Sequence, residues 1–176
     1  MSININPKIY MNVKTLGQGV KKPDDTRNYC IYNEARVQTL ANEGDDVLPY
    51  LKEYLQNTSD KTNENGVLEA LCVIDKLADK NPKSLDKMYP YLSKFNDTNS
   101  PDIQVMLSGI YRKILVPDAF GPLCKMLHKQ ITHPNSKYFD PTEETGGAIL
   151  EYLRSYGAQN AYKAADANNA HFNMPV

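Results

Sequence analysis

The sequence contains no tryptophan, only three cysteines among 176 residues, and a net charge of only -1. Because none of Cys30, Cys72 and Cys124 forms a C-x-x-C pair, we interpret them as reduced structural cysteines of a cytoplasmic protein. No apolar run reaches the length of a membrane-spanning helix, and the first residues lack the basic and apolar regions of a secretory signal. The near-neutral charge argues against a protein built mainly to hold nucleic acid or an anionic membrane.

Motifs that would carry catalysis or hold a cofactor are also missing. The "LGQG" stretch at 16–19 lacks the G-K-[ST] ending of a phosphate loop, and no strand precedes it. Cys124 and His128 stand four residues apart on one predicted helix, but no second ligand pair has a suitable spacing for zinc. Glu143 and Glu144 are adjacent and point to different helix faces. We therefore expect a non-enzymatic protein without a metal site or a cofactor.

A seven-residue pattern occurs three times, with aspartate four residues before proline. The copies are "DDVLPYL" (45–51), "DKMYPYL" (86–92) and "DAFGPLC" (118–124). Proline inside a helix costs about 3 kcal/mol, but in the first turn it costs little, because the amides there have no partner within the helix. The pattern therefore predicts that each proline marks the start of a helix, with an aspartate as its cap.

A second pattern repeats in the same rhythm. Leu40, Leu77 and Ile114 end three helical patterns 37 residues apart, and Leu153 follows 39 residues later. Two helix-length patterns per period are typical of helical-hairpin repeats. We expect the first helix of each pair at 29–42, 65–79 and 101–115, with a fourth such helix that ends near Tyr156. We expect the second helix of each pair at 46–57, 84–96 and 118–132.

The stretch "YLSKFNDTNSPDIQVMLSGIYRKILVPDAFGPLCKML" resembles a HEAT repeat, of the broad HEAT/armadillo-like class. The family often carries an arginine early in the helix after the Asp loop, whereas this helix has Gln104. The resemblance implies an all-α fold, a right-handed alpha-solenoid of about three and a half stacked repeats over residues 29–165. We expect an irregular N-terminal arm at 1–28 and a flexible C-terminal tail at 166–176.

The predicted arm is basic, with five basic and two acidic residues in 1–28. Its apolar positions, among them Ile9 and Val13, allow two interpretations. The arm lies over the first helical pair and caps its core, or it docks on a partner or another subunit.

Tyrosine is the predominant aromatic residue, with 12 tyrosines against four phenylalanines. Aligned on the prolines, Tyr50, Tyr91 and Leu123 share one position at the edge of the apolar face. Tyrosine is favoured at protein interfaces because it is large, rigid and amphipathic. The neighbouring positions are of mixed charge, which suits a protein better than a phosphate backbone. The predicted partner-binding residues are Tyr50, Lys52, Glu53, Tyr91, Lys94 and Lys125.

These features predict a scaffold or adaptor that binds a protein or peptide on the face lined by the second helix of each repeat. Two alternatives come from HEAT-like families. One is nucleic-acid binding like that of DNA alkylpurine glycosylases, for which 100–132 offers only a weak basic patch (Arg112, Lys113, Lys125 and Lys129). The other is a bilin-lyase-like activity, which no residue marks. Fold resemblance alone does not decide among them.

Overall fold

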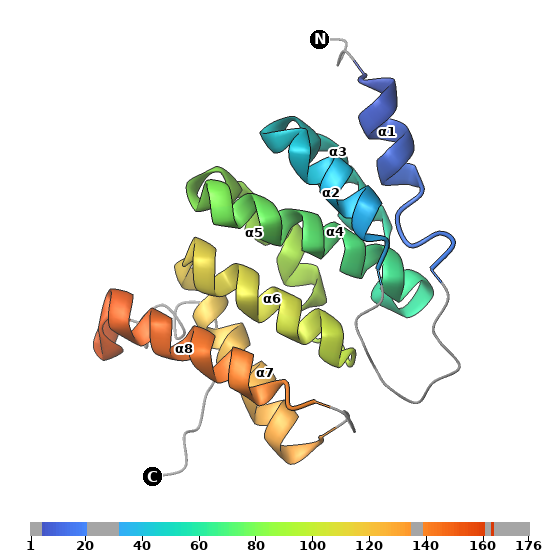
Figure 1. Cartoon of the computed structure of the whole chain (residues 1–176). Helices are drawn as coiled ribbons and strands as arrows, with labels where there is room; N and C mark the ends of the chain where they lie inside the picture. The colour runs from blue at the N-terminus through green and yellow to red at the C-terminus, as the bar shows by residue number, and fades with distance from the viewer. Residues whose placement is uncertain (1–4, 21–31, 135–138, 161–162, 164–176) are drawn as a thin grey trace. The chain divides into compact units, whose positions relative to one another are not determined.

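The structure, a computed structural model, describes residues 5–20, 32–134, 139–160 and 163. Every regular element within these residues is helical, which confirms the all-α prediction (Figure 1). The chain forms two compact units, Met1–Tyr91 and Leu92–Val176. None of the helices within the described ranges is both long and apolar enough to cross a membrane. The predicted tail at 166–176 and Cys30 lie outside the described residues.

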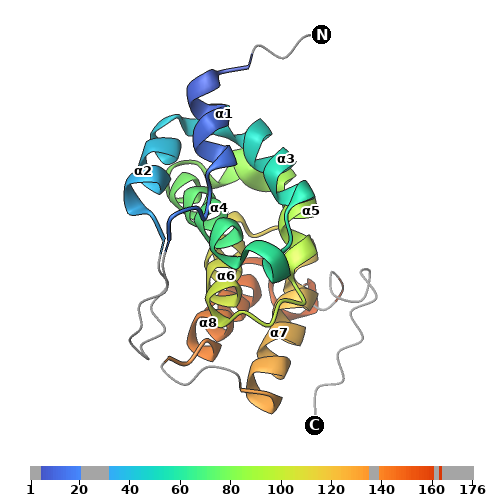
Figure 2. The ribbon, with the colours of Figure 1, turned by 90° about the vertical axis from the view of Figure 1, so that its right-hand side faces the viewer.

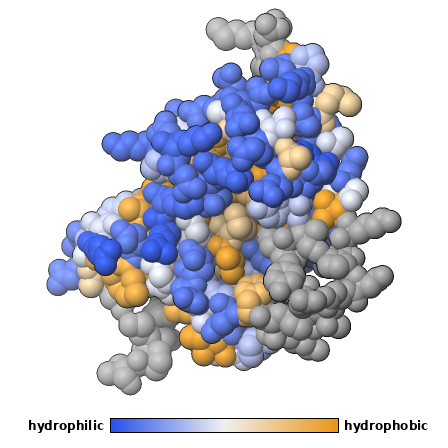
Figure 3. Space-filling model, in the orientation of Figure 1, coloured by the Kyte–Doolittle hydropathy of each residue, from blue (hydrophilic) through white to orange (hydrophobic). Residues whose placement is uncertain are grey.

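In its described residues, the first unit contains four full helices and most of a fifth. They are α1 (Pro7–Lys14), α2 (Glu34–Asn42), α3 (Leu48–Asn57), α4 (Asp60–Lys80) and the short α5 (Tyr89–Leu92). Figures 1 and 2 show α1 beside α2 and α3, with α2 packed on α4. The core consists of fully buried aliphatic side chains, including Val37, Leu40, Leu51, Leu55, Leu71, Ile74 and Leu85. Hydrophilic side chains cover most of this unit's face in Figure 3.

The prolines do mark helix starts, but a 3₁₀ turn takes the place of the predicted aspartate cap. Pro49 and Pro90 are the second residues of α3 and α5, and Pro122 is the third residue of α7 (Phe120–Thr132). A 3₁₀ turn at Gly44–Val47, Pro82–Met88 or Pro117–Ala119 runs directly into each of these helices. The early amides of these helices need no intrahelical partner, so the prolines cost no helical hydrogen bond.

The prediction of an irregular arm is wrong for Pro7–Lys14, which form α1. The Asn6 side chain accepts hydrogen bonds from the amides of Lys8 (3.0 Å) and Ile9 (3.4 Å), and Pro7 occupies the first helical position. Ile9 and Val13, four residues apart on one helix face, are 1% and 4% exposed. Within the predicted arm, α1 packs on α2 and α3, the first helical pair.

Among the first helices of the predicted pairs, α2 and α4 begin at other residues than expected. Asn33 caps α2 by accepting the amide of Arg36 (3.0 Å), so this helix begins at Glu34 and not at residue 29. The predicted loop before residue 65 is partly helical, because α4 begins at Asp60. Asn63 interrupts α4 with non-helical backbone angles, and its side chain accepts the amide of Gly66 (3.0 Å) as an internal cap.

In the second unit, α6 (Pro101–Ile114) and α7 pack on α8 (Thr142–Tyr156). Ser100 caps α6 by accepting the amide of Ile103 (3.4 Å). The core again consists of buried apolar side chains, including Ile103, Leu107, Ile110, Tyr111, Leu123, Ala148 and Tyr152. The helical spacing of these positions puts the buried side chains of each helix on one face.

Cys124 lies in this core, and burial raises the pKa of its thiol to about 11. At pH 8 the thiolate fraction is then about 0.1%, against roughly 25% for a free cysteine. We expect pulse labelling with a thiol reagent, followed by mass spectrometry of the Cys124 peptide, to be at least about 100-fold slower in the folded protein than in urea. Labelling at equal rates in both states would contradict this burial.

Candidate functional site

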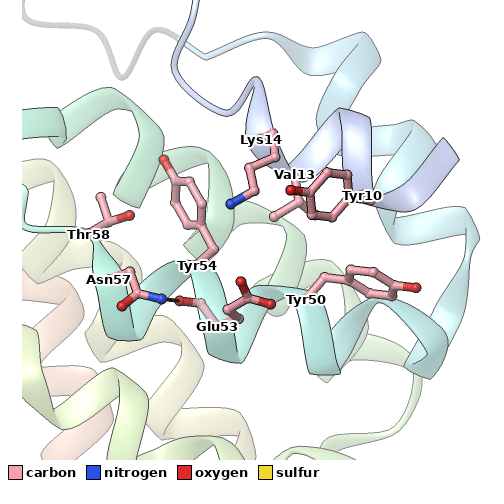
Figure 4. Close-up of a pocket in the computed structure, with 8 residues that line it drawn as sticks. All are labelled: Tyr10, Val13, Lys14, Tyr50, Glu53, Tyr54, Asn57 and Thr58. Atoms are coloured by element: carbon pink, nitrogen blue, oxygen red, sulfur yellow. Dashed lines mark hydrogen bonds between the residues drawn. The ribbon is translucent and has the colours of Figure 1, made fainter. Parts of the chain in front are cut away.

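A cavity of about 230 Å³ lies between α1 and α3 in the first unit (Figure 4). The lining residues are Tyr10, Val13, Lys14, Tyr50, Glu53, Tyr54, Asn57 and Thr58. Two of them, Tyr50 and Glu53, belong to the partner-binding set predicted from the sequence. Because α1 supplies one wall, this cavity depends on the helix that the sequence analysis expected to be irregular.

Two tyrosine hydroxyl groups are held by other parts of the first unit. The Tyr50 hydroxyl accepts a hydrogen bond from the Asn6 amide (2.7 Å), which ties α3 to the residue that caps α1. The Tyr54 hydroxyl accepts from Nδ2 of Asn63 (3.0 Å) and donates to the Leu16 carbonyl (3.5 Å). Burial raises the pKa of Tyr54, so its hydroxyl stays protonated at neutral pH. Both rings are thereby fixed before any ligand arrives.

One positive and one negative side chain enter the cavity from opposite walls. Lys14 extends from α1, with its Nζ 5.3 Å from the ring centroid of Tyr10, and Glu53 extends from α3. Figure 4 shows the Lys14 ammonium between Val13 and Tyr54, and the Glu53 carboxylate below it. Among the described ion pairs, none joins these two charges. Both therefore remain able to pair with charges on a ligand.

A buried carboxylate, that of Glu69 on α4, sets the position of α1. Its side chain is 0% exposed and accepts hydrogen bonds from the amides of Gly17 and Asn33, each at 2.8 Å. The Nε of Arg36 lies 3.2 Å from the same carboxylate as an ion pair, without the alignment of a hydrogen bond. The ion pair balances the charge of the Glu69 carboxylate, and the two amides satisfy its oxygens as acceptors. Without such partners, a buried carboxylate would be strongly destabilising.

The turn that follows α1 is also held by hydrogen bonds from Arg36 and by a close backbone contact at Gly17. The Arg36 guanidinium donates hydrogen bonds to the carbonyl groups of Thr15 and Gln18. Gly17, at φ 77°, lies so close to α4 that an added Cβ would stand 2.5 Å from the amide nitrogen of Gly66. Only glycine therefore fits at position 17 of the "LGQG" turn. This turn fixes the wall of the cavity that α1 supplies.

The six residues predicted to bind a partner do not form one site. Besides Tyr50 and Glu53 in the cavity, Lys52 on α3 and Tyr91 on α5 lie together, with the Lys52 Nζ 5.8 Å from the Tyr91 ring centroid. Lys94 and Lys125 belong to the second unit, and neither lines this cavity. The Lys94 Nζ lies 5.6 Å from the Phe95 ring centroid, and Lys125 is exposed on α7.

Several residues of the cavity were missed by the sequence analysis. Tyr10 and Lys14 were assigned to the irregular arm, although Asn6 before Pro7 was a usable signal of a helix start. Tyr54 shares the spacing of the inward leucines of α3, yet it is only partly buried. Asn57 ends α3, and Thr58 follows it.

Comparisons with family models, with curated proteins and with solved structures found no match to this chain. Among the described residues, no group of three or more histidine, cysteine, aspartate or glutamate side chains could hold a metal ion. The chemistry of the cavity is therefore argued from its own side chains. Three aromatic rings, two opposite charges and the amide and hydroxyl groups of Asn57 and Thr58 can bind a ligand that is both apolar and polar.

Proposed function

We propose that this chain is a non-enzymatic protein- or peptide-binding module of the HEAT-like solenoid type, and that its partner binds along α3. The observation that carries the proposal is the cavity between α1 and α3, with its three tyrosines and its separate positive and negative side chains. The Lys52–Tyr91 pair, formed by α3 and α5, offers a second candidate contact on another side of α3. Repeats of this kind commonly bind partners along an extended row of helices.

The size of the cavity favours a side chain of a partner over a free cofactor. Small-molecule sites usually enclose about 300–1,000 Å³. A volume of about 230 Å³ instead suits one large side chain or two small ones inserted from a peptide. Tyrosine rings lose little conformational entropy on binding and are enriched among the residues that dominate protein interfaces.

The distribution of charge favours a protein partner over a nucleic acid. A phosphate backbone requires a coherent stretch of basic side chains. The cavity offers one lysine, Lys14, against one glutamate, Glu53. In the second unit, the Lys129 ammonium of the weak basic patch already donates to the carbonyl groups of Asp97 (3.0 Å) and Thr98 (3.1 Å). No described contact favours the bilin-lyase-like alternative.

A peptide library displayed on phage tests the proposal. We expect the full chain to select peptides that bind with micromolar affinity, and the variant Glu53→Lys to weaken this binding at least about tenfold, equivalent to 1.4 kcal/mol. The reversed charge would repel the basic side chain that pairs with Glu53. Affinities would be measured by calorimetry or fluorescence polarisation.

The variant Glu34→Lys is the matched control. Glu34 is an exposed acid in the first turn of α2 and does not line the cavity. Its reversal changes the net charge by the same amount, so the selected peptides should bind this variant within about twofold of the wild type. If both variants bind equally, or if no peptide is selected, the proposed surface on α3 is refuted.

A further inference from the structure

A relay of buried amide and hydroxyl groups joins the three full helices of the second unit. Gln104 on α6, Gln130 on α7 and Thr145 on α8 are 1%, 4% and 0% exposed. The Gln130 Nε2 donates to the Gln104 Oε1 (3.1 Å) and to the Thr145 Oγ1 (3.0 Å). The Gln104 Nε2 donates in turn to the Thr98 carbonyl (3.0 Å). Hydrogen bonds thus fix both amide groups in the core.

The relay has a direction, and it leaves one acceptor without a donor. Because the Gln104 Nε2 must donate to a carbonyl group, its Oε1 faces Gln130 and requires the Nε2 of that residue. Rotating the Gln130 amide by half a turn would place two oxygens against each other. The Gln130 Oε1 therefore stays where it is, buried and without a hydrogen-bond partner. A buried acceptor in this state destabilises the fold until a donor reaches it.

Gln130 also lines a cavity of about 360 Å³ in the second unit. The other described lining residues are Ile131, Pro134, Phe139, Asp140, Pro141 and Thr142. Their side chains are mostly apolar, one of them is aromatic, and none is lysine, arginine or histidine. Their side chains offer one polar acceptor, the Asp140 carboxylate, and one hydroxyl, that of Thr142, which already donates to Asp140.

Asp140 supplies a negative charge at the exposed side of this cavity. Its Oδ1 accepts hydrogen bonds from the Thr142 hydroxyl (2.6 Å) and the Thr142 amide (2.9 Å). These bonds lower the pKa of Asp140, so the carboxylate is ionised throughout the neutral range. The carbonyl end of α7, next to Ile131, adds negative potential, and Glu143 and Glu144 offset the positive end of α8.

We propose that this cavity binds an arginine side chain of a partner protein. Arginine has a long apolar stem for the walls and five N–H donors in a fixed planar arrangement. One donor satisfies the Gln130 Oε1, another pairs with the Asp140 carboxylate, and the guanidinium stacks on the Phe139 ring. This site lies in the second unit and is independent of the cavity between α1 and α3.

NMR titration of the full-length protein tests this assignment with three blocked tripeptides: acetyl-Gly-Arg-Gly-amide, its citrulline analogue and its lysine analogue. Citrulline has the shape of arginine without the charge. We expect the arginine peptide to shift the Gln130 side-chain amide and the Thr142 backbone amide with a millimolar Kd. The citrulline peptide should bind at least about tenfold more weakly, because charged donors form the stronger hydrogen bonds.

The variant Asp140→Asn should weaken binding of the arginine peptide about fivefold, since it removes the charge but keeps an acceptor for Thr142. Glu143→Gln is the matched control, because Glu143 is an exposed acid three residues further along the chain that does not line the cavity; its effect should stay within about twofold. Equal shifts by the arginine and citrulline peptides, or by the arginine and lysine peptides, would overturn the assignment. An unchanged affinity in Asp140→Asn would also overturn it.

Discussion

Replacing Glu69 with alanine is expected to lower the free energy of unfolding by about 3–5 kcal/mol, the usual cost of removing one partner of a buried ion pair. The variant leaves the Arg36 guanidinium, 9% exposed, without its buried counter-charge. It also deprives the amides of Gly17 and Asn33 of their acceptor. Urea denaturation followed by circular dichroism measures the change.

The matched control for this variant is Asp79→Ala, which removes an exposed acid from the same helix, α4. Substitutions at exposed positions usually change stability by no more than about 0.5 kcal/mol. A second variant, Glu69→Gln, keeps the size of the side chain but removes the charge and one acceptor oxygen, so it should also be strongly destabilised. If Glu69→Ala changed stability no more than Asp79→Ala, Glu69 would not anchor the turn after α1.

Replacing Gly17 with alanine should lower the free energy of unfolding by about 2–5 kcal/mol, the second large effect that we expect. An alanine at φ 77° costs about 1–2 kcal/mol by itself. Its Cβ would also stand 2.5 Å from the amide nitrogen of Gly66, a backbone atom that cannot rotate away. Forcing extra atoms into a packed contact adds typically about 1–3 kcal/mol. Denaturant titration of the variant against the wild type measures the sum.

Gly19→Ala separates the two causes, because Gly19 has nearly the same backbone angle, φ 73°, with nothing within 4 Å of an added Cβ. This control should lose only the conformational part, about 1–2 kcal/mol. The difference in the loss of stability between Gly17→Ala and Gly19→Ala therefore measures the cost of crowding the contact between the turn and α4. Equal losses would show that the contact with Gly66 contributes nothing to stability.

Helix starts and inward faces could be predicted from the sequence because their causes are local. A helix tolerates proline in its first turn but not in its interior, so Pro49, Pro90 and Pro122, each followed by a helical pattern, indicate helix starts without reference to tertiary contacts. Apolar spacing likewise predicts which face of each helix is buried. The 3₁₀ turns before these prolines were not predicted, because an aspartate before a helix signals a cap and a 3₁₀ turn alike.

The cavity between α1 and α3 could not be predicted, since it depends on contacts between distant residues. Lys14 and Glu53 face each other only because α1 lies against α3, and α1 lies there because Glu69 holds the turn that follows it. No local pattern distinguishes a glutamate that will be fully buried from one on the surface. Of the predicted set, Tyr50 and Glu53 line this cavity, whereas Lys94 and Lys125, which were included because the repeats were treated as equivalent, belong to the second unit.

The distance along the chain between Gly17 and its acceptor, 52 residues, has a consequence for how the protein is made. At 5–20 residues per second, synthesis reaches Glu69 about 3–10 s after Gly17. During that interval Arg36 has already been added, but its buried counter-charge has not. The turn that follows α1 is thus among the last parts of its unit to be fixed in place, because its acceptor on α4 is made after α2 and α3.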